Sequence, residues 1–132
     1  MKKKDGLKIM LVDYDKHVRE SLKLFFKTSQ NDFLIFKSAS QGLNSLKHQR
    51  VEVVISDYFL PDMNGIEFLK EAARIQPEVR RILIATMTCG DMEDQVQQEG
   101  IDRFLEKPLT VASLDTVIDE MENLNVSNHS RR

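Results

Sequence analysis

Residues 51–65 read VEVVISDYFLPDMNG, and the rest of the chain is organised around this segment. An apolar, largely β-branched run ends in the carboxylate of Asp57, and a loop containing Pro61 and Gly65 leads into a helical pattern that starts at Ile66. This pattern is typical of a buried strand followed by a helix. Open α/β proteins bind their ligands at the carboxyl ends of such strands. We therefore interpret Asp57 as the reactive group of the protein.

Apolar runs resembling this strand recur along the chain, at residues 7–12, 33–36, 82–86 and 101–105. Several are nearly continuous, as expected for parallel strands covered on both faces. The intervening stretches carry apolar residues at helical spacing, most clearly in residues 18–26 and 114–121. Strand and helix patterns alternate five times, which predicts an α/β fold with a five-stranded parallel sheet and helices on both faces.

Residues that favour helix ends refine the expected boundaries of these helices. Ser40 is a candidate N-cap for the second helix, and the third should end before Pro77. Gly42 and Gly100 have the character of glycines at helix boundaries. The fourth helix, at about residues 91–98, has only two apolar residues, so we expect it to pack loosely and to be a candidate for movement.

Composition excludes several classes of protein. The 132 residues are 41% hydrophobic and 30% charged, which argues against a disordered chain. A formal net charge of −2 gives no electrostatic footprint for nucleic acid. Cys89 is the single cysteine, so no internal disulfide is expected, and neither a secretory signal nor a long apolar span is evident. We expect a cytoplasmic domain that binds neither nucleic acid nor membrane.

Polar residues stand where the predicted strands end. Asp13 follows the first run with Asp15 two positions later, Asp57 ends the third, Thr86 ends the fourth, and Lys107 follows the fifth. Because the carboxyl ends of parallel strands share one edge, these side chains should converge. Carboxylate oxygens without His or Cys favour Mg²⁺. Beside such a metal Asp57 would attack phosphorus to give an acyl phosphate, with Lys107 and Thr86 contacting the transferred oxygens.

Four segments give this pattern a family resemblance, namely IMLVD (9–13), DYFLPDMNG (57–65), ILIAT (82–86) and FLEKP (104–108). Over about residues 8–122 the chain resembles the receiver domain of two-component response regulators. The resemblance implies a flavodoxin-like (βα)5 fold with strand order 2-1-3-4-5. We accordingly predict a receiver domain over residues 1–124, followed by a polar C-terminal tail or the start of a linker over residues 125–132.

The resemblance also implies roles for individual residues. Asp57 would accept a phosphoryl group from a phosphohistidine, with Asp13, Asp57 and the backbone carbonyl of Phe59 as Mg²⁺ ligands and Asp15 as a further candidate. Lys107 would bind the phosphate, and its peptide bond to Pro108 would be cis. Thr86 and Phe104 fall at the switch positions of the family. The chain would then be no enzyme beyond its own phosphoryl transfer and slow autodephosphorylation.

The partners implied are a sensor histidine kinase or a phosphotransfer protein, and an output domain or protein that the sequence does not identify. Phosphorylation would change a protein–protein surface formed by the fourth helix, the fifth strand and the fifth helix. A homodimer through the same surface is a further candidate assembly.

The chain departs from the family pattern at three positions. Tyr14 stands where the family usually has a second acid that binds the metal directly, which bears on metal affinity. Met87 replaces a residue that is usually very small, and Phe59 is bulky, so together they should hinder an attacking water and give a long-lived acyl phosphate. Phe104 replaces the commoner Tyr and has no hydroxyl to bond in either of its switch positions.

Two alternatives follow from these departures. A pseudo-receiver, a binding module on the same fold that phosphorylation does not control, would account for Tyr14. A phosphatase of the haloacid-dehalogenase type would use residues 13–15 as an Asp-x-Asp motif, but that reading leaves residues 57–65 unexplained.

Overall fold

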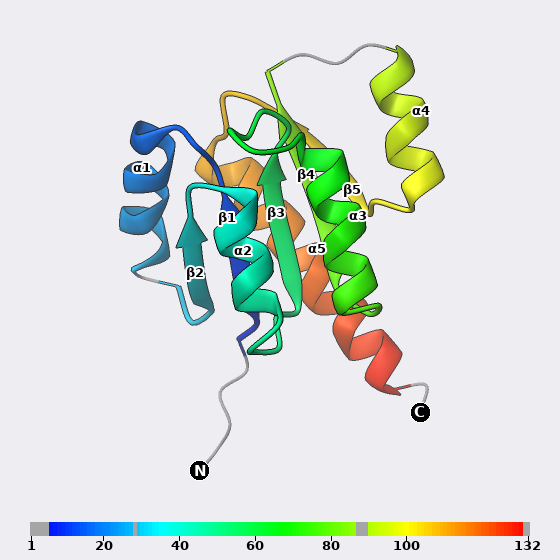
Figure 1. The fold of residues 1–132 in the computed structure, drawn as a ribbon. Helices are drawn as coiled ribbons and strands as arrows, with labels where there is room; N and C mark the ends of the chain where they lie inside the picture. Colours follow the sequence, from blue (N-terminus) through cyan, green and yellow to red (C-terminus); the bar gives the residue numbers. More distant parts are fainter. Residues whose placement is uncertain (1–5, 28, 87–89, 131–132) are drawn as a thin grey trace.

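The computed structural model of the chain describes residues 6–27, 29–86 and 90–130 (Figure 1). Within these ranges five parallel strands form one sheet in the order β2-β1-β3-β4-β5. The strands are β1 (Lys8–Val12), β2 (Asp32–Phe36), β3 (Val53–Asp57), β4 (Arg80–Ala85) and β5 (Arg103–Glu106). The helices are α1 (Lys16–Phe26), α2 (Ala39–Leu46), α3 (Gly65–Ile75), α4 (Gly90–Glu99) and α5 (Val111–Ser130). The predicted α/β fold and the strand order implied by the resemblance are both confirmed.

The helices cover the two faces of the sheet in separate layers, with α2, α3 and α4 on one face and α1 and α5 on the other (Figure 1). Alternate residues of each central strand point to opposite faces, which gives two apolar cores. Met10 and Val54 belong to the core under α2 and α3, whereas Ile9 and Val53 belong to the core under α1 and α5. Every residue of β3 is buried, so the strand that ends in Asp57 is held from both sides.

Two local predictions around α2 are wrong. The N-cap is Ser38, whose side chain accepts a hydrogen bond from the N–H of Gln41, and not Ser40. Gly42 lies inside α2 and not at its boundary. A Cβ there would come within 3.0–3.1 Å of the Phe68 ring and within 3.1 Å of Val12, so the close packing of α2 on the sheet and on α3, which the sequence pattern does not reveal, favours a glycine at this position.

A carboxylate from a distant loop completes the N-terminus of α2. Asp62 accepts hydrogen bonds from the N–H of Ala39 at 3.0 Å and of Ser40 at 2.8 Å. Burial tends to raise the pKa of Asp62, but the donated N–H groups of Ser40 and Ala39 outweigh it and lower that pKa below its ordinary value. The loop that follows β3 is thereby tied to α2.

The structure of α4 and α5 can be compared with the predicted helix boundary, the predicted loose packing of the fourth helix and the predicted C-terminal tail or linker. Gly100 has a φ of 71° just after α4, as predicted for a glycine at a helix boundary. Met92 is buried and Val96 is half-buried in α4, which is the thin apolar stripe that the sequence indicated. The backbone of α5 continues as helix to Ser130, and a role for residues 125–132 as tail or linker stays a prediction. No helix in the described ranges is long and apolar enough to span a bilayer.

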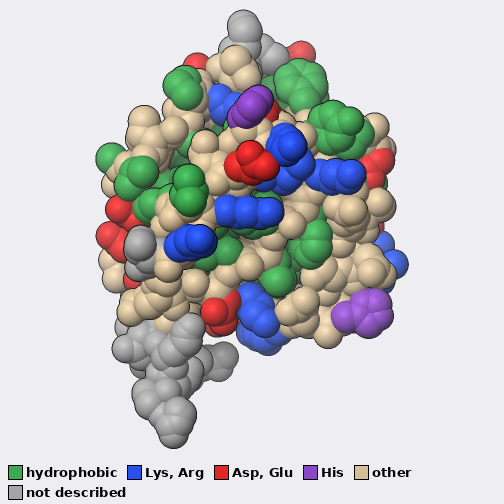
Figure 2. Space-filling model, turned by 90° about the vertical axis from the view of Figure 1, so that its left-hand side faces the viewer, with side chains coloured by type: hydrophobic (Ala, Val, Ile, Leu, Met, Phe, Trp, Pro, Cys, Tyr) green, Lys and Arg blue, Asp and Glu red, His purple; other side chains and the backbone are tan. Residues whose placement is uncertain are grey.

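Charge is distributed unevenly over the fold. Residues 90–124 hold ten Asp and Glu but only two Lys and Arg. Figure 2 views the molecule from the side of α1 and β2, where Lys and Arg side chains gather across the middle of the face. The surface of α4 and α5 is therefore acidic, whereas the opposite edge of the sheet is predominantly basic.

Candidate functional site

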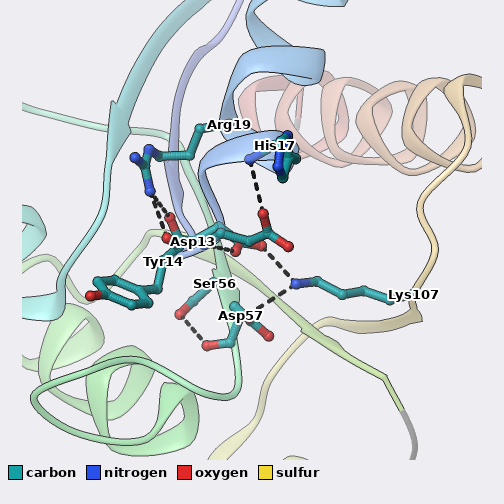
Figure 3. A network of polar contacts seen from close by, with 8 residues as sticks. Asp13, Tyr14, His17, Arg19, Ser56, Asp57 and Lys107 are labelled. Carbon is teal, nitrogen blue, oxygen red and sulfur yellow. Dashed lines mark hydrogen bonds and ion pairs between the residues drawn. The ribbon is translucent and has the colours of Figure 1, made fainter.

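Three charged side chains meet at the carboxyl edge of the sheet (Figure 3). Asp13 directly follows β1, Asp57 is the last residue of β3, and Lys107 directly follows β5. The Lys107 Nζ lies 3.1 Å from the Asp13 Oδ2 and 3.1 Å from the Asp57 Oδ2. The structure thus brings together three of the residues predicted to form the site, although they are as far as 94 positions apart in the sequence.

Burial and charge act against each other in this cluster. Asp13 is fully buried and Asp57 is 7% exposed. Burial raises the pKa of Asp13, and repulsion from Asp57 adds to it, so that together they outweigh the hydrogen bond from the N–H of Asp15 and the attraction of Lys107. Burial tends to lower the pKa of Lys107, but the two carboxylates outweigh it and raise that pKa. Two buried carboxylates share one ammonium, so the cluster favours a second cation.

The backbone around Asp57 is tightly held. The Ser56 hydroxyl donates to the Asp57 carbonyl oxygen at 2.9 Å, and the N–H of Gly65 donates to the Tyr58 carbonyl oxygen at 2.7 Å. A Cβ on Gly65 would lie 2.3 Å from the Asp57 carbonyl oxygen, which no real Cβ tolerates. Only glycine therefore lets α3 begin this close to the end of β3. Phe59 lies in the loop between them with its side chain 67% exposed.

The loop between β1 and α1 places its side chains in different directions. Asp15 is the N-cap of α1, where its Oδ1 accepts a hydrogen bond from the N–H of His17 at 2.9 Å. Its carboxylate is therefore committed to the helix and is not brought into the cluster with Asp57. Tyr14 is 59% exposed, and its ring points away from Lys107 (Figure 3). The Asp13 Oδ1 accepts a hydrogen bond from the N–H of Asp15 at 2.9 Å.

Arg19, which the sequence pattern did not single out, contacts this loop. Its Nη1 donates to the carbonyl oxygens of Asp13 at 3.0 Å and of Tyr14 at 2.8 Å. The signal available in the sequence was a cation close to the start of a predicted helix, where the helix dipole disfavours positive charge.

The predicted switch residues lie near the same edge. Thr86 follows β4 and is exposed, and Phe104 on β5 pairs with Leu83 of β4. Phe104 is half-buried and packs against the core under α2, α3 and α4. The Lys107–Pro108 peptide bond is cis, as the resemblance implied. Met87, which was predicted to narrow access to Asp57, lies outside the described residues.

The donor set fits a hard cation that retains water ligands. Asp13 Oδ2 is buried and lies within ion-pair distance of Lys107, but it accepts no hydrogen bond in the structure. Nowhere in the described part of the chain do three or more His, Cys, Asp or Glu residues gather as metal ligands. Mg²⁺ commonly takes one or two carboxylates and fills its octahedron with water. The two carboxylates of Asp13 and Asp57 therefore fit the protein share of such a Mg²⁺ site.

Comparison with known proteins identifies the family. Residues 9–119 match the family model of the response regulator receiver domain, so the chain belongs to this family. It is 33% identical over 119 residues to Response regulator Rre1 of Synechocystis, covering 86% of this chain and 51% of that protein. It is 29% identical over 114 residues to the transcriptional regulatory protein GlrR of Escherichia coli, covering 85% of this chain and 25% of that protein. The chain thus spans about half or less of the length of these curated relatives.

Solved structures agree with this assignment. The signal receiver domain of an HD domain-containing protein from Pseudomonas fluorescens superposes with a TM-score of 0.86 at 25% identity, covering 92% of this chain and 98% of that one. A CheY-like receiver domain from Methanospirillum hungatei gives a TM-score of 0.81 at 24% identity, covering 89% and 98%. The latter likeness shows the fold, which is the receiver fold.

Proposed function

We propose that this receiver domain is a phosphoacceptor, in which Asp57 takes a phosphoryl group from a phosphohistidine on a sensor histidine kinase or a phosphotransfer protein. The observation that carries the proposal is the buried Asp57–Lys107–Asp13 cluster at the carboxyl edge of the sheet. An aspartate held there has a nearby ammonium, and clustered carboxylates that favour a metal cation.

The chemistry follows from these groups. An oxygen of the Asp57 carboxylate attacks phosphorus, a P–O bond forms as the P–N bond to the donor imidazole breaks, and the imidazole leaves with the bonding electrons. Asp13, Asp57 and the carbonyl of Phe59 would hold Mg²⁺, which when bound neutralises charge on the phosphoryl oxygens. Lys107 would leave its carboxylate partners in part and contact a phosphoryl oxygen, since its Nζ already lies 3.1 Å from Asp57. The domain catalyses no reaction beyond this transfer and slow autodephosphorylation.

The signal would be a change of surface. Thr86 would bond the new phosphoryl group and Phe104 would turn behind it, shifting α4, β5 and α5. The acidic character of residues 90–124 favours an output partner with a basic surface. A homodimer through this surface would set like charges against each other, which is unfavourable in a symmetric interface. A solved neighbour, the beryllofluoride-activated NtrC4 receiver domain, is described as a dimer. Measuring the mass of this chain in solution, with and without phosphorylation, therefore tests whether it forms a homodimer.

Labelling with radioactive acetyl phosphate tests the proposal. Wild type should become labelled in Mg²⁺ and remain unlabelled in excess EDTA, and hydroxylamine should release the label as expected for an acyl phosphate. Asp57→Asn should not become labelled. Asp62→Asn, which replaces another acid of the same loop by its amide, should become labelled like wild type. Labelling of Asp57→Asn at the wild-type level would overturn the assignment of the acceptor.

A pseudo-receiver is the second candidate, and the loop after β1 favours it. Tyr14 is exposed, and the next acid, Asp15, caps α1, so fewer carboxylates converge than in the predicted ligand set. Wild type that stays unlabelled in Mg²⁺, under conditions that label a control receiver, would favour a module that phosphorylation does not control.

A further inference from the structure

The first turn of α1 carries its charges against the usual preference. The helix begins at Lys16 and has no acidic residue in its first turn, and Arg19 follows three residues later. Cations near a helix N-terminus are unfavourable by roughly 0.3–1 kcal/mol, because the N–H end of the dipole is positive. A residue that is locally unfavourable, such as a cation near a helix N-terminus, often has a functional role. Arg19 therefore has a local cost that a specific contact should offset.

That contact is a double hydrogen bond to the loop before the helix. A single nitrogen of Arg19, Nη1, donates to the carbonyl oxygens of Asp13 and Tyr14, at 3.0 and 2.8 Å. The N–H of Arg19 also donates to the Asp15 carbonyl oxygen at 3.1 Å, as the first turn of α1 requires. Arg19 is half-buried, and its bond to the Asp13 carbonyl oxygen is partly protected from water, whereas its bond to the Tyr14 carbonyl oxygen is exposed. Two successive peptide groups of the loop are fixed by one side chain.

Fixing both peptide groups fixes where the side chains between them point. Asp13 has its side chain fully buried against Lys107, whereas Tyr14 is 59% exposed. The Arg19 guanidinium lies on the side of Asp13 and Tyr14 away from Lys107, and the Tyr14 ring points outward (Figure 3). Rotation of these peptide groups would break both bonds to Arg19 and would free the ring to take another direction.

We propose that Arg19 is a positioning residue that keeps the Tyr14 ring turned out of the acidic site and so leaves room for a metal beside Asp13 and Asp57. The inference rests on the proposed function, because it concerns the same site. It explains how a receiver domain tolerates a large aromatic residue next to its first acid. Arg19 binds the backbone of Tyr14 from the side away from Lys107, and so restrains the direction of the tyrosine ring.

Electrostatics alone predicts the opposite effect of removing Arg19. The positive charge of Arg19, which binds the backbone of Asp13 and Tyr14, opposes binding of Mg²⁺ beside it, so loss of the charge should tighten metal binding. Loss of positioning should weaken it, because the ring would be free to enter the site. The sign of the change in Mg²⁺ affinity therefore separates the two effects.

A double-mutant cycle tests the proposal with Mg²⁺ alone as the probe, measured by calorimetric titration and by the Mg²⁺ dependence of acetyl phosphate labelling. Arg19→Met should weaken Mg²⁺ binding roughly tenfold, the lower end of the usual effect of residues behind a metal ligand. Excess Mg²⁺ should restore its labelling rate. Tyr14→Ala should bind Mg²⁺ like wild type, and the double variant should recover to near the wild-type affinity. Lys23→Met, an exposed cation on the same helix, is the matched control and should change nothing.

Tyrosine fluorescence gives a second readout that needs no metal. The chain has no Trp and only two Tyr, so in a Tyr58→Phe background the emission comes from Tyr14 alone. Acrylamide should quench Tyr14 strongly when Arg19 is present and less when Arg19 is Met. If Arg19→Met does not fold, Arg19→Lys, which keeps the charge but not the planar fork, should show the same changes to a smaller degree.

Three results would overturn the proposal: unchanged or tighter Mg²⁺ binding in Arg19→Met, a double variant whose defect is no smaller than that of Arg19→Met, or quenching that does not depend on Arg19. Failure of the proposed function looks different. In that case wild type itself neither binds Mg²⁺ nor becomes labelled, while the quenching experiment still decides whether Arg19 positions Tyr14.

Discussion

Replacing Lys107 by Met should destabilise the domain strongly at pH 7 and much less at pH 5. Its ammonium lies 3.1 Å from each of two buried carboxylates, and removing one partner of a buried charge cluster typically costs about 3–5 kcal/mol. The loss of stability in Lys107→Met has an upper limit, because Asp13 can take up a proton instead of remaining charged without a partner. From an ordinary pKa of 3.8, that protonation costs about 4 kcal/mol at pH 7 and about 2 kcal/mol at pH 5.

The same charge balance predicts the opposite sign for Asp57→Asn. This change leaves one carboxylate facing one ammonium and removes the repulsion that raises the pKa of Asp13. We expect it to be neutral or to stabilise by roughly 0.5–2 kcal/mol, as is common when a functional charge cluster is relieved.

The assay is urea denaturation followed by circular dichroism, without metal, at pH 7 and pH 5. Arg103→Met is the matched control, because Arg103 pairs with Glu120 at 2.8 Å on the exposed surface and should matter by about 1 kcal/mol or less. Any of three outcomes would contradict this charge balance: Lys107→Met and Arg103→Met with the same stability at pH 7, a Lys107→Met defect that does not shrink at pH 5, or an Asp57→Asn variant destabilised as much as Lys107→Met.

Three further changes test other parts of the structure. Asp62→Ala should cost about 1 kcal/mol of folding stability at pH 7 through loss of the cap on α2. Because the pKa of Asp62 is lowered from 3.8, this stability is complete above that value and is lost as the pH falls through the lowered pKa. Wild type and variant should therefore converge in acid denaturation, and a difference that persists would contradict the capping role of Asp62. Gly65→Ala should cost about 3 kcal/mol or more and slow labelling of Asp57, since the new Cβ would lie 2.3 Å from a backbone oxygen, and a variant as stable as wild type in urea would show that the packing is looser. Phosphorylated wild type should lose its label slowly, and Phe59→Ala should lose it several times faster in the same radiolabel decay assay, whereas a wild-type half-life of seconds would refute shielding by Phe59.

Much of the fold was determined by local sequence pattern. Apolar β-branched runs such as residues 53–55 are typical of strands buried on both faces, and the helical stripe that includes Leu22 and Phe26 is typical of a helix that packs one face on a core. Because alternating strands and helices have few ways to pack, the parallel sheet followed. The boundaries of α2 did not follow, because its true N-cap and the need for Gly42 depend on Asp62, Phe68 and Val12, which lie far away in sequence.

The site divides in the same way. The apolar pattern places Asp13, Asp57 and Lys107 at strand ends, and parallel topology then carries such residues to one edge. The folded chain alone reveals that Lys107 bridges both carboxylates, that Asp15 caps α1, and that Arg19 holds the loop beside Tyr14. The two differ because strand ends follow from the periodicity of the sequence, whereas the direction of a side chain in a loop is fixed by hydrogen bonds that form only when the chain has folded.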